Sequence, residues 1–130
     1  MLVGLDKQER LFFRLPVALK ATYRFIPDEP EFGAYRTARE GVVENLSGGG
    51  LLLRTEEPPV ELVGDLLSGR LGLAIRLDLP GGPVEALARV AWIESEGRIG
   101  SDVHMGLGFQ EITTEDRDRV IRAVVDAFMK

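Results

Sequence analysis

The chain has 130 residues, 45% of them apolar and 28% charged, which is the composition of one globular domain rather than of a disordered chain. It contains no cysteine, which excludes disulfides, thiol catalysis and cysteine-ligated zinc or iron–sulfur sites. A formal net charge of −5 argues against general nucleic-acid binding. The apolar runs are too short for a transmembrane helix, and the first ten residues are too charged for a signal peptide, so we expect a cytoplasmic protein without membrane insertion.

The first predicted element is a strand over Val17–Phe25, where apolar and polar residues alternate as in a half-buried strand. Turns rich in proline and glycine are predicted at Ile26–Gly33 and Pro80–Pro83. Further strands are predicted at Tyr35–Glu44, Leu51–Arg54, Leu71–Leu79, Val84–Ile93 and Val103–Gln110. The alternation places Trp92 on the same face as Val90.

Between the third and fourth predicted strands, Thr55–Arg70 reads as a polar connection. Pro58 and Pro59 each lack a backbone N–H, so we expect no regular structure there.

The period of the apolar residues changes near the C-terminus. Thr113 can cap a helix whose first turn carries Glu115 and Asp116, where the helix dipole favours acidic side chains. Apolar residues then recur at helical spacing, at Val120, Ile121, Val124, Val125 and Phe128. The order of elements predicts a mainly β fold, a six-stranded antiparallel β-barrel with a C-terminal α-helix that plugs or flanks it.

The sequence offers little for catalysis. The single histidine, His104, lies at an outward position of a predicted strand, which favours a solvated or hydrogen-bonded structural role. The glycine-rich runs lack the sequence context of a P-loop or a dinucleotide-binding turn. We therefore expect no catalytic residue, no metal site and no enzyme.

Two features, by contrast, are suited to binding an anion. Arg10 and Arg14 lie four residues apart in a segment, residues 1–24, that contains five basic and two acidic residues. Guanidinium groups offer paired donors to phosphate oxygens or to the O6/N7 edge of guanine. In the run Asn45–Gly50 (NLSGGG), glycines permit positive φ, which lets consecutive backbone N–H groups point outward toward an anion. Alone, each feature is more typical of solvated side chains or an ordinary hairpin.

Together, the pattern R-x-x-x-R followed by N-x-S-x-x-G resembles the PilZ domain, the bacterial receptor module for cyclic di-GMP. The similarity covers nearly the whole chain, through Leu15-Pro16-Val17, Ala88–Trp92, Gly106–Phe109 and the final helix. This resemblance implies a six-stranded barrel with the ligand on its outer surface and the arginine segment wrapping across it.

The resemblance also implies a role for each matching residue. Arg10 and Arg14 would bind guanine and phosphate groups, and backbone and side chains of the loop would contact the ligand. The loop residues are Asn45, Ser47 and Gly50, with Gly48 and Gly49 completing the loop.

Three positions need separate comment. Asn45 stands where many members of the family have Asp, and both side chains can accept hydrogen bonds. Glu9 stands where some members have another Arg that helps to hold a stacked ligand dimer, which argues against that binding mode here. Trp92 either stacks on a base or is buried in the barrel, and the buried position is favoured.

We thus expect a non-catalytic receptor that binds cyclic di-GMP and needs no cofactor. Residues 1–14 would form a flexible arm and residues 15–130 the barrel domain, and ordering of the arm would pass the signal to an unidentified partner protein. The alternative is a PilZ-like adaptor that no longer binds the nucleotide. A homodimer through Ala123, Ala127 and Met129 also stays open, because these side chains can instead cover the end of the barrel.

Overall fold

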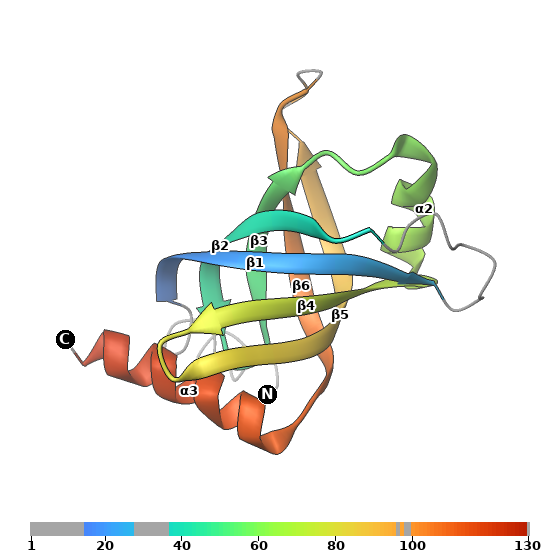
Figure 1. The fold of residues 1–130 in the computed structure, drawn as a ribbon. Helices are drawn as coiled ribbons and strands as arrows, with labels where there is room; N and C mark the ends of the chain where they lie inside the picture. Colours follow the sequence, from blue (N-terminus) through green and yellow to red (C-terminus); the bar gives the residue numbers. More distant parts are fainter. Residues whose placement is uncertain (1–14, 28–36, 96, 98–99, 130) are drawn as a thin grey trace, which may run out of the picture.

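Six antiparallel strands close into a barrel, with a helix at each of its two ends (Figure 1). The computed structural model describes residues 15–27, 37–95, 97 and 100–129. Their elements are β1 (Leu15–Pro27), β2 (Arg39–Ser47), β3 (Gly50–Glu56), α2 (Val60–Ser68), β4 (Leu71–Leu79), β5 (Gly82–Ser95), β6 (Asp102–Ile112) and α3 (Thr114–Phe128). Around the barrel the strand order is β1-β2-β3-β6-β5-β4, with β4 pairing back to β1. The predicted mainly β barrel with a C-terminal helix is confirmed.

The interior is filled by the apolar side chains of the alternating pattern. In β1, Ala21, Tyr23 and Phe25 point inward and are buried, as the alternation predicts. The Tyr23 hydroxyl and Thr55 Oγ1 share a hydrogen bond of 2.8 Å, so the polar atom that Tyr23 brings into the core is satisfied. Because each large buried apolar side chain contributes about 1.5–3 kcal/mol, this core provides a rigid support for the outer face.

Helix α3 closes the end of the barrel where β2 turns into β3. Its N-cap is Thr113, whose side chain accepts a hydrogen bond from the Asp116 backbone N–H at 3.1 Å, as the sequence predicts. Val120 and Val124 are fully buried against the barrel. Ala123, at an adjacent position of the helix, is partly buried and packs on the core, so this part of the helix covers the barrel end.

Helix α2 closes the opposite end, and it corrects the prediction of an irregular connection. The helix starts directly after Pro59, its N-cap, and ends at Gly69, which adopts a left-handed φ of 83°. Leu62 and Leu66 are buried in the barrel end. Proline disrupts a helix from the interior, but the N-terminal N–H groups of a helix have no intrahelical partner, so proline costs little at that end. In the described ranges, no helix is long and apolar enough to cross a membrane.

Candidate functional site

The N-x-S-x-x-G segment forms the hairpin between β2 and β3. Strand β2 runs beyond its predicted end at Glu44 to Ser47, which pairs with Gly50, so Gly48 and Gly49 alone form the turn. The Ser47 hydroxyl donates to the carbonyl oxygen of Gly50 at 3.1 Å and closes this turn. The motif therefore shapes the edge of the barrel next to α3.

The glycines of this hairpin are required for space rather than for positive φ. None of Gly48, Gly49 and Gly50 has a positive φ, so the predicted outward-pointing series of N–H groups built on positive φ is wrong. Gly50 pairs with Gly108 of β6, and a Cβ at Gly50 would overlap the carbonyl oxygen of Leu107. The close approach of β3 to β6 explains the glycine at position 50.

Four residues from four neighbouring strands form a row across the outer face of the barrel. Asn45 of β2 pairs with Leu52 of β3, Leu52 pairs with Gly106 of β6, and Gly106 pairs with Trp92 of β5. This row is the floor of a hollow of about 330 Å³, which Ser47, Gly49 and Gly50 also line. Of these four residues only Gly106 has no side chain.

Trp92 belongs to this hollow and not to the barrel core. Trp92 is 42% exposed, so the favoured prediction of a buried position is wrong. The register of β5 against β6 shifts between Val90 and Trp92, where two steps along β5 match one step along β6. This bulge reverses the alternation and turns Trp92 outward. A Cβ at Gly106 would overlap the indole Nε1, so the ring lies over Gly106.

Gly106 is a site residue that the sequence analysis did not assign to the site. From sequence, Gly106–Phe109 is one of the segments that carry the resemblance, without a role in binding. Its alternation does contain a usable signal, because two glycines at outward positions of one strand predict a flat patch beside which a large side chain can lie.

A second bulge turns Asn45 outward at the other end of the row. Val43 pairs with Leu53 and Asn45 with Leu52, so Glu44 is the extra residue of β2. The Asn45 side chain has no hydrogen-bond partner within the part of the chain that the structure describes. Its amide is therefore available to a ligand in the hollow.

Next to this row lies a cluster of charged side chains on the same outer face. Glu44 accepts from Arg54 Nε at 3.1 Å and contacts His104 Nε2 at 2.7 Å. Arg54 NH1 also donates to Asp102 Oδ2 at 3.1 Å. The contact with Glu44 agrees with the predicted hydrogen-bonded position of His104.

The segment with Arg10, Arg14 and Glu9 lies outside the described residues. The described chain begins at Leu15, which pairs with Leu46, and Pro16 pairs with Asn45 itself. The chain therefore enters the barrel directly beside the row. Pro16 of β1 extends the row by one residue.

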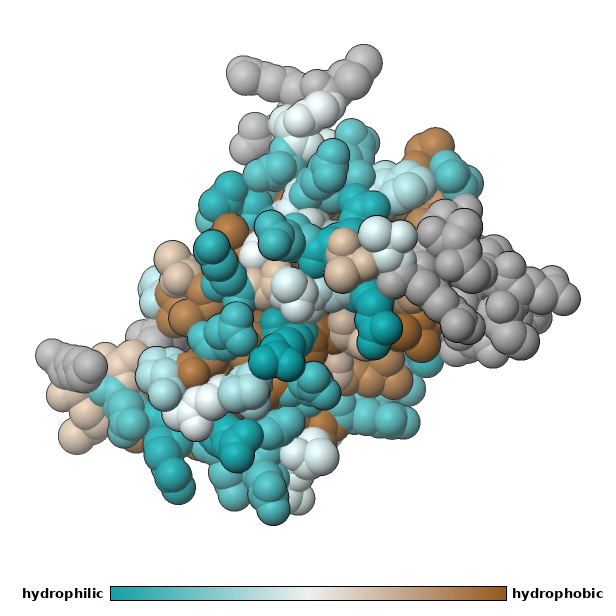
Figure 2. Space-filling view, viewed as in Figure 1, coloured by the Kyte–Doolittle hydropathy of each residue, from teal (hydrophilic) through white to brown (hydrophobic). Residues whose placement is uncertain are grey.

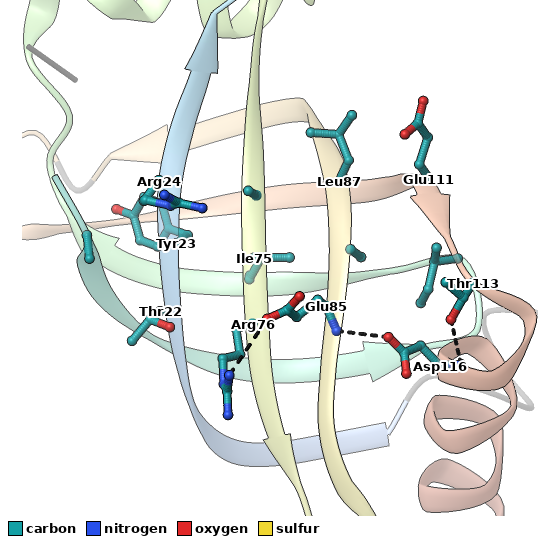
Figure 3. Close-up of a pocket in the computed structure, with 14 residues that line it drawn as sticks. Thr22, Tyr23, Arg24, Ile75, Arg76, Glu85, Leu87, Glu111, Thr113 and Asp116 are labelled. Carbon is teal, nitrogen blue, oxygen red and sulfur yellow. Dashed lines mark hydrogen bonds and ion pairs between the residues drawn. The ribbon is translucent and has the colours of Figure 1, made fainter. Parts of the chain in front are cut away.

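A larger hollow, about 700 Å³, lies on the outer face of β1, β4 and β5 (Figure 3). Among its charged residues, Arg76 and Glu85 lie 3.7 Å apart, and the Glu85 backbone N–H donates to Asp116 Oδ2 at 3.2 Å. Figure 2 views this side of the molecule, where hydrophilic side chains cover much of the surface. None of the predicted site residues lines it, so we do not assign it to the site.

The described side chains include no group of three or more histidine, aspartate and glutamate residues that could hold a metal ion.

The hollow with Asn45 and Trp92 offers an amide, a hydroxyl, backbone edges and an aromatic ring. These groups suit the binding of a planar base with polar edges.

The sequence pattern of the PilZ domain matches residues 8–126. No curated protein matches as a relative in sequence. The chain resembles the inhibitor of motility MotI/DgrA of Bacillus subtilis, with a TM-score of 0.67 and 18% identity over 94% of this chain and 52% of that chain. This chain thus spans about half the length of MotI/DgrA.

Two further solved structures contain c-di-GMP. The PilZ domain of YcgR from Escherichia coli has a TM-score of 0.61 and 15% identity over 93% of this chain and 95% of that chain. The complex of MrkH from K. pneumonia has a TM-score of 0.62 and 15% identity over 89% of this chain and 50% of that chain. At these identities the similarity shows a common fold.

Proposed function

The chain belongs to the PilZ domain family, and from this premise we propose that it is a non-catalytic receptor for cyclic di-GMP. The observation that carries the proposal is the row of Asn45, Leu52, Gly106 and Trp92 on the outer face of the barrel. It brings the N-x-S-x-x-G hairpin, an exposed aromatic ring and the entry of the N-terminal segment to one place. YcgR and MrkH, which share the fold, have been solved with this nucleotide.

Each group of the hollow has a matching part of the ligand. Asn45 has donors and an acceptor for the edge of a guanine, and Trp92 has a ring face on which a base can stack. Arg10 and Arg14 supply the positive charge that two phosphates require, because among the residues of the row there is no cation. Glu9 beside Arg10 disfavours a stacked pair of ligands, so we propose that one nucleotide binds.

The signal leaves through residues 1–14 in this proposal. They precede β1 at the point where Pro16 pairs with Asn45, so a ligand in the hollow lies within reach of both arginines. Ordering of residues 1–14 over the ligand creates a new surface for a partner protein, while residues 15–130 act as a fixed frame. The alternative is an adaptor that does not bind the nucleotide.

Titration calorimetry with cyclic di-GMP tests the proposal. Each charge-assisted contact contributes about 1.5–3 kcal/mol, so Arg14→Ala weakens binding about 10- to 100-fold and Arg10→Ala/Arg14→Ala abolishes measurable binding. Arg24→Ala is the matched control, because Arg24 lies on the outer face of β1 beside the larger hollow. Wild-type affinity in the double variant would refute the proposed site, and no binding by the wild type would favour the adaptor.

A further inference from the structure

Helix α2 has a second apolar face, on the side turned away from the barrel. Leu62 and Leu66 are buried in the barrel end, whereas Val60 is 83% and Leu67 50% exposed. Residues spaced i, i+3, i+4 and i+7 share one face of a helix. On the outer face of α2 this spacing is occupied by Val60, Val63, Gly64 and Leu67. The exposed apolar side chains therefore belong to one continuous face, unlike the isolated apolar residues that are common on protein surfaces.

Gly64 lies in the middle of this outer face, and its surroundings in the described part of the chain do not require a glycine. A Cβ at Gly64 would meet no atom within 4 Å, and the φ of Gly64 is not positive. Glycine inside a helix lowers helix stability relative to alanine. What a glycine does provide at the centre of an exposed apolar face is room for another backbone to approach closely.

The outer face of α2 is complementary to itself when two copies of the helix run in opposite directions. Val60 and Leu67 lie at equal distances on either side of the step from Val63 to Gly64. An antiparallel pair therefore packs Val60 of one copy against Leu67 of the other, at both ends of the contact. The two Gly64 residues then meet near the centre, where the missing side chains let the helices come close. Such a contact uses the same residues in both copies, as a two-fold dimer requires.

The charges at the ends of α2 favour the antiparallel direction. Glu57 and Glu61 are exposed at the N-terminal end. Arg70 follows the C-terminal end, where its side chain is 72% exposed and forms a surface ion pair with Asp65 at 3.0 Å. In an antiparallel pair, Arg70 of one copy lies level with Glu57 and Glu61 of the other, whereas a parallel pair brings like charges together. Charges at the rim of a contact fix its direction more than its strength.

We propose that α2 is a self-association face, through which two copies of this chain pair with their α2 helices antiparallel. This inference goes beyond the proposed function and does not depend on it. The hairpin of the candidate site lies at the α3 end of the barrel, opposite α2, so pairing through α2 leaves that end of each copy free (Figure 1). A helix of nine residues offers a contact smaller than the roughly 1,200 Å² typical of stable complexes, so we expect a weak dimer with a dissociation constant of about 0.1 mM.

The test is sedimentation equilibrium of the full chain without nucleotide, from about 10 μM to about 1 mM. The average mass of wild type is expected to rise with concentration from that of one chain toward that of two. Leu67→Glu places a carboxylate against Val60 of the other copy and is expected to weaken association about tenfold or more. Val125→Glu, at an exposed apolar residue of α3, is the matched control and is expected to associate like wild type. A wild type that stays monomeric at the highest concentration, or a Leu67→Glu variant that associates as tightly, would overturn the proposal.

Gly64→Leu separates pairing from folding. The new side chain has room on the outer face of α2 and raises helix propensity, so the midpoint of urea unfolding is expected to stay the same or rise. Self-association is expected to be lost, because the leucine keeps the two helices apart. Association of this variant at the wild-type level would show that Gly64 is not at the contact and would overturn the proposal.

An exchange of charges tests the direction of the pair. Arg70→Glu and the double variant Glu57→Arg/Glu61→Arg each place like charges together in the antiparallel dimer, and each alone is expected to associate about threefold more weakly than wild type. An equimolar mixture of the two variants restores opposite charges at both ends and is expected to associate like wild type. Association no stronger in the mixture than in either variant alone would overturn the antiparallel arrangement.

Discussion

The two outer faces of the barrel are made of the same kind of antiparallel ladder, yet the side chains on them are arranged differently. Over β1, β4 and β5, long charged residues such as Arg76 and Glu85 satisfy one another across the strands. Over β2, β3, β6 and β5, the row between Asn45 and Trp92 contains Gly106, over which the indole ring lies, and the polar and aromatic ends of the row have been turned outward by two bulges. The candidate site depends on one missing side chain, at Gly106, and on local breaks in register, and size alone does not identify it, because a larger hollow lies over β1, β4 and β5.

Of the variants that test this comparison, we expect the largest effect on stability from a side chain added at Gly50. Gly50→Val forces β3 away from the Leu107 carbonyl and is expected to destabilise the fold by roughly 3 kcal/mol in urea unfolding, and to impair nucleotide binding. Gly49→Ala is the matched control, since a Cβ there meets no atom within 4 Å, and is expected to change stability by less than about 0.5 kcal/mol. Equal unfolding free energies for the two variants would show that the close approach is not needed.

A smaller effect is expected when the aromatic end of the row is removed. Stacking of a base on an aromatic ring is worth about 1–3 kcal/mol, so Trp92→Ala is expected to weaken cyclic di-GMP binding roughly tenfold in calorimetry. Stability is expected to fall by less than for a core residue, because Trp92 is 42% exposed. Trp92→Phe retains a ring and is expected to recover part of the loss. Unchanged affinity in Trp92→Ala would remove the ring from the site.

The smallest effect belongs to the self-paired face. Arg76 is 53% exposed and its contacts with Asp78 and Glu85 are both 3.7 Å long. Arg76→Ala is therefore expected to cost about 0–1 kcal/mol of stability in urea and to leave nucleotide affinity at the wild-type value. A change in affinity comparable to that of Trp92→Ala would mean that the two faces are not separate in function.

Strand periodicity was sufficient to predict the barrel, but it failed where a single residue interrupts the period. The alternation in β5 assigns Trp92 to the interior because it counts Ala91 as an ordinary position, whereas the bulge absorbs one residue and inverts the face. A bulge depends on the neighbouring strand, and a single sequence does not contain that register.

Helix α2 was missed for a different reason. Pro58 and Pro59 were weighed as helix breakers, although the apolar residues Leu62 and Leu66 that follow them lie one helical turn apart and point into the barrel. Whether a proline disrupts a helix depends on its position relative to the start of that helix. Of the candidate site, the hairpin motif and Trp92 could be named from sequence, while Gly106 emerged only once β5 and β6 were seen as partners.

The pairing of β1 with β4 has a consequence for how the barrel assembles. Hairpins such as β4–β5 form between residues near in sequence. The barrel closes only when distant residues pair, such as Ala21 of β1 with Leu77 of β4. Closing such a long loop early costs chain entropy that nearby contacts do not repay, so folding of this topology is slow compared with helical proteins. Strand β1 can pair early with its sequence neighbour β2, so we expect the late steps of folding to be the long-range pairings of β1 with β4 and of β3 with β6, which together close the barrel.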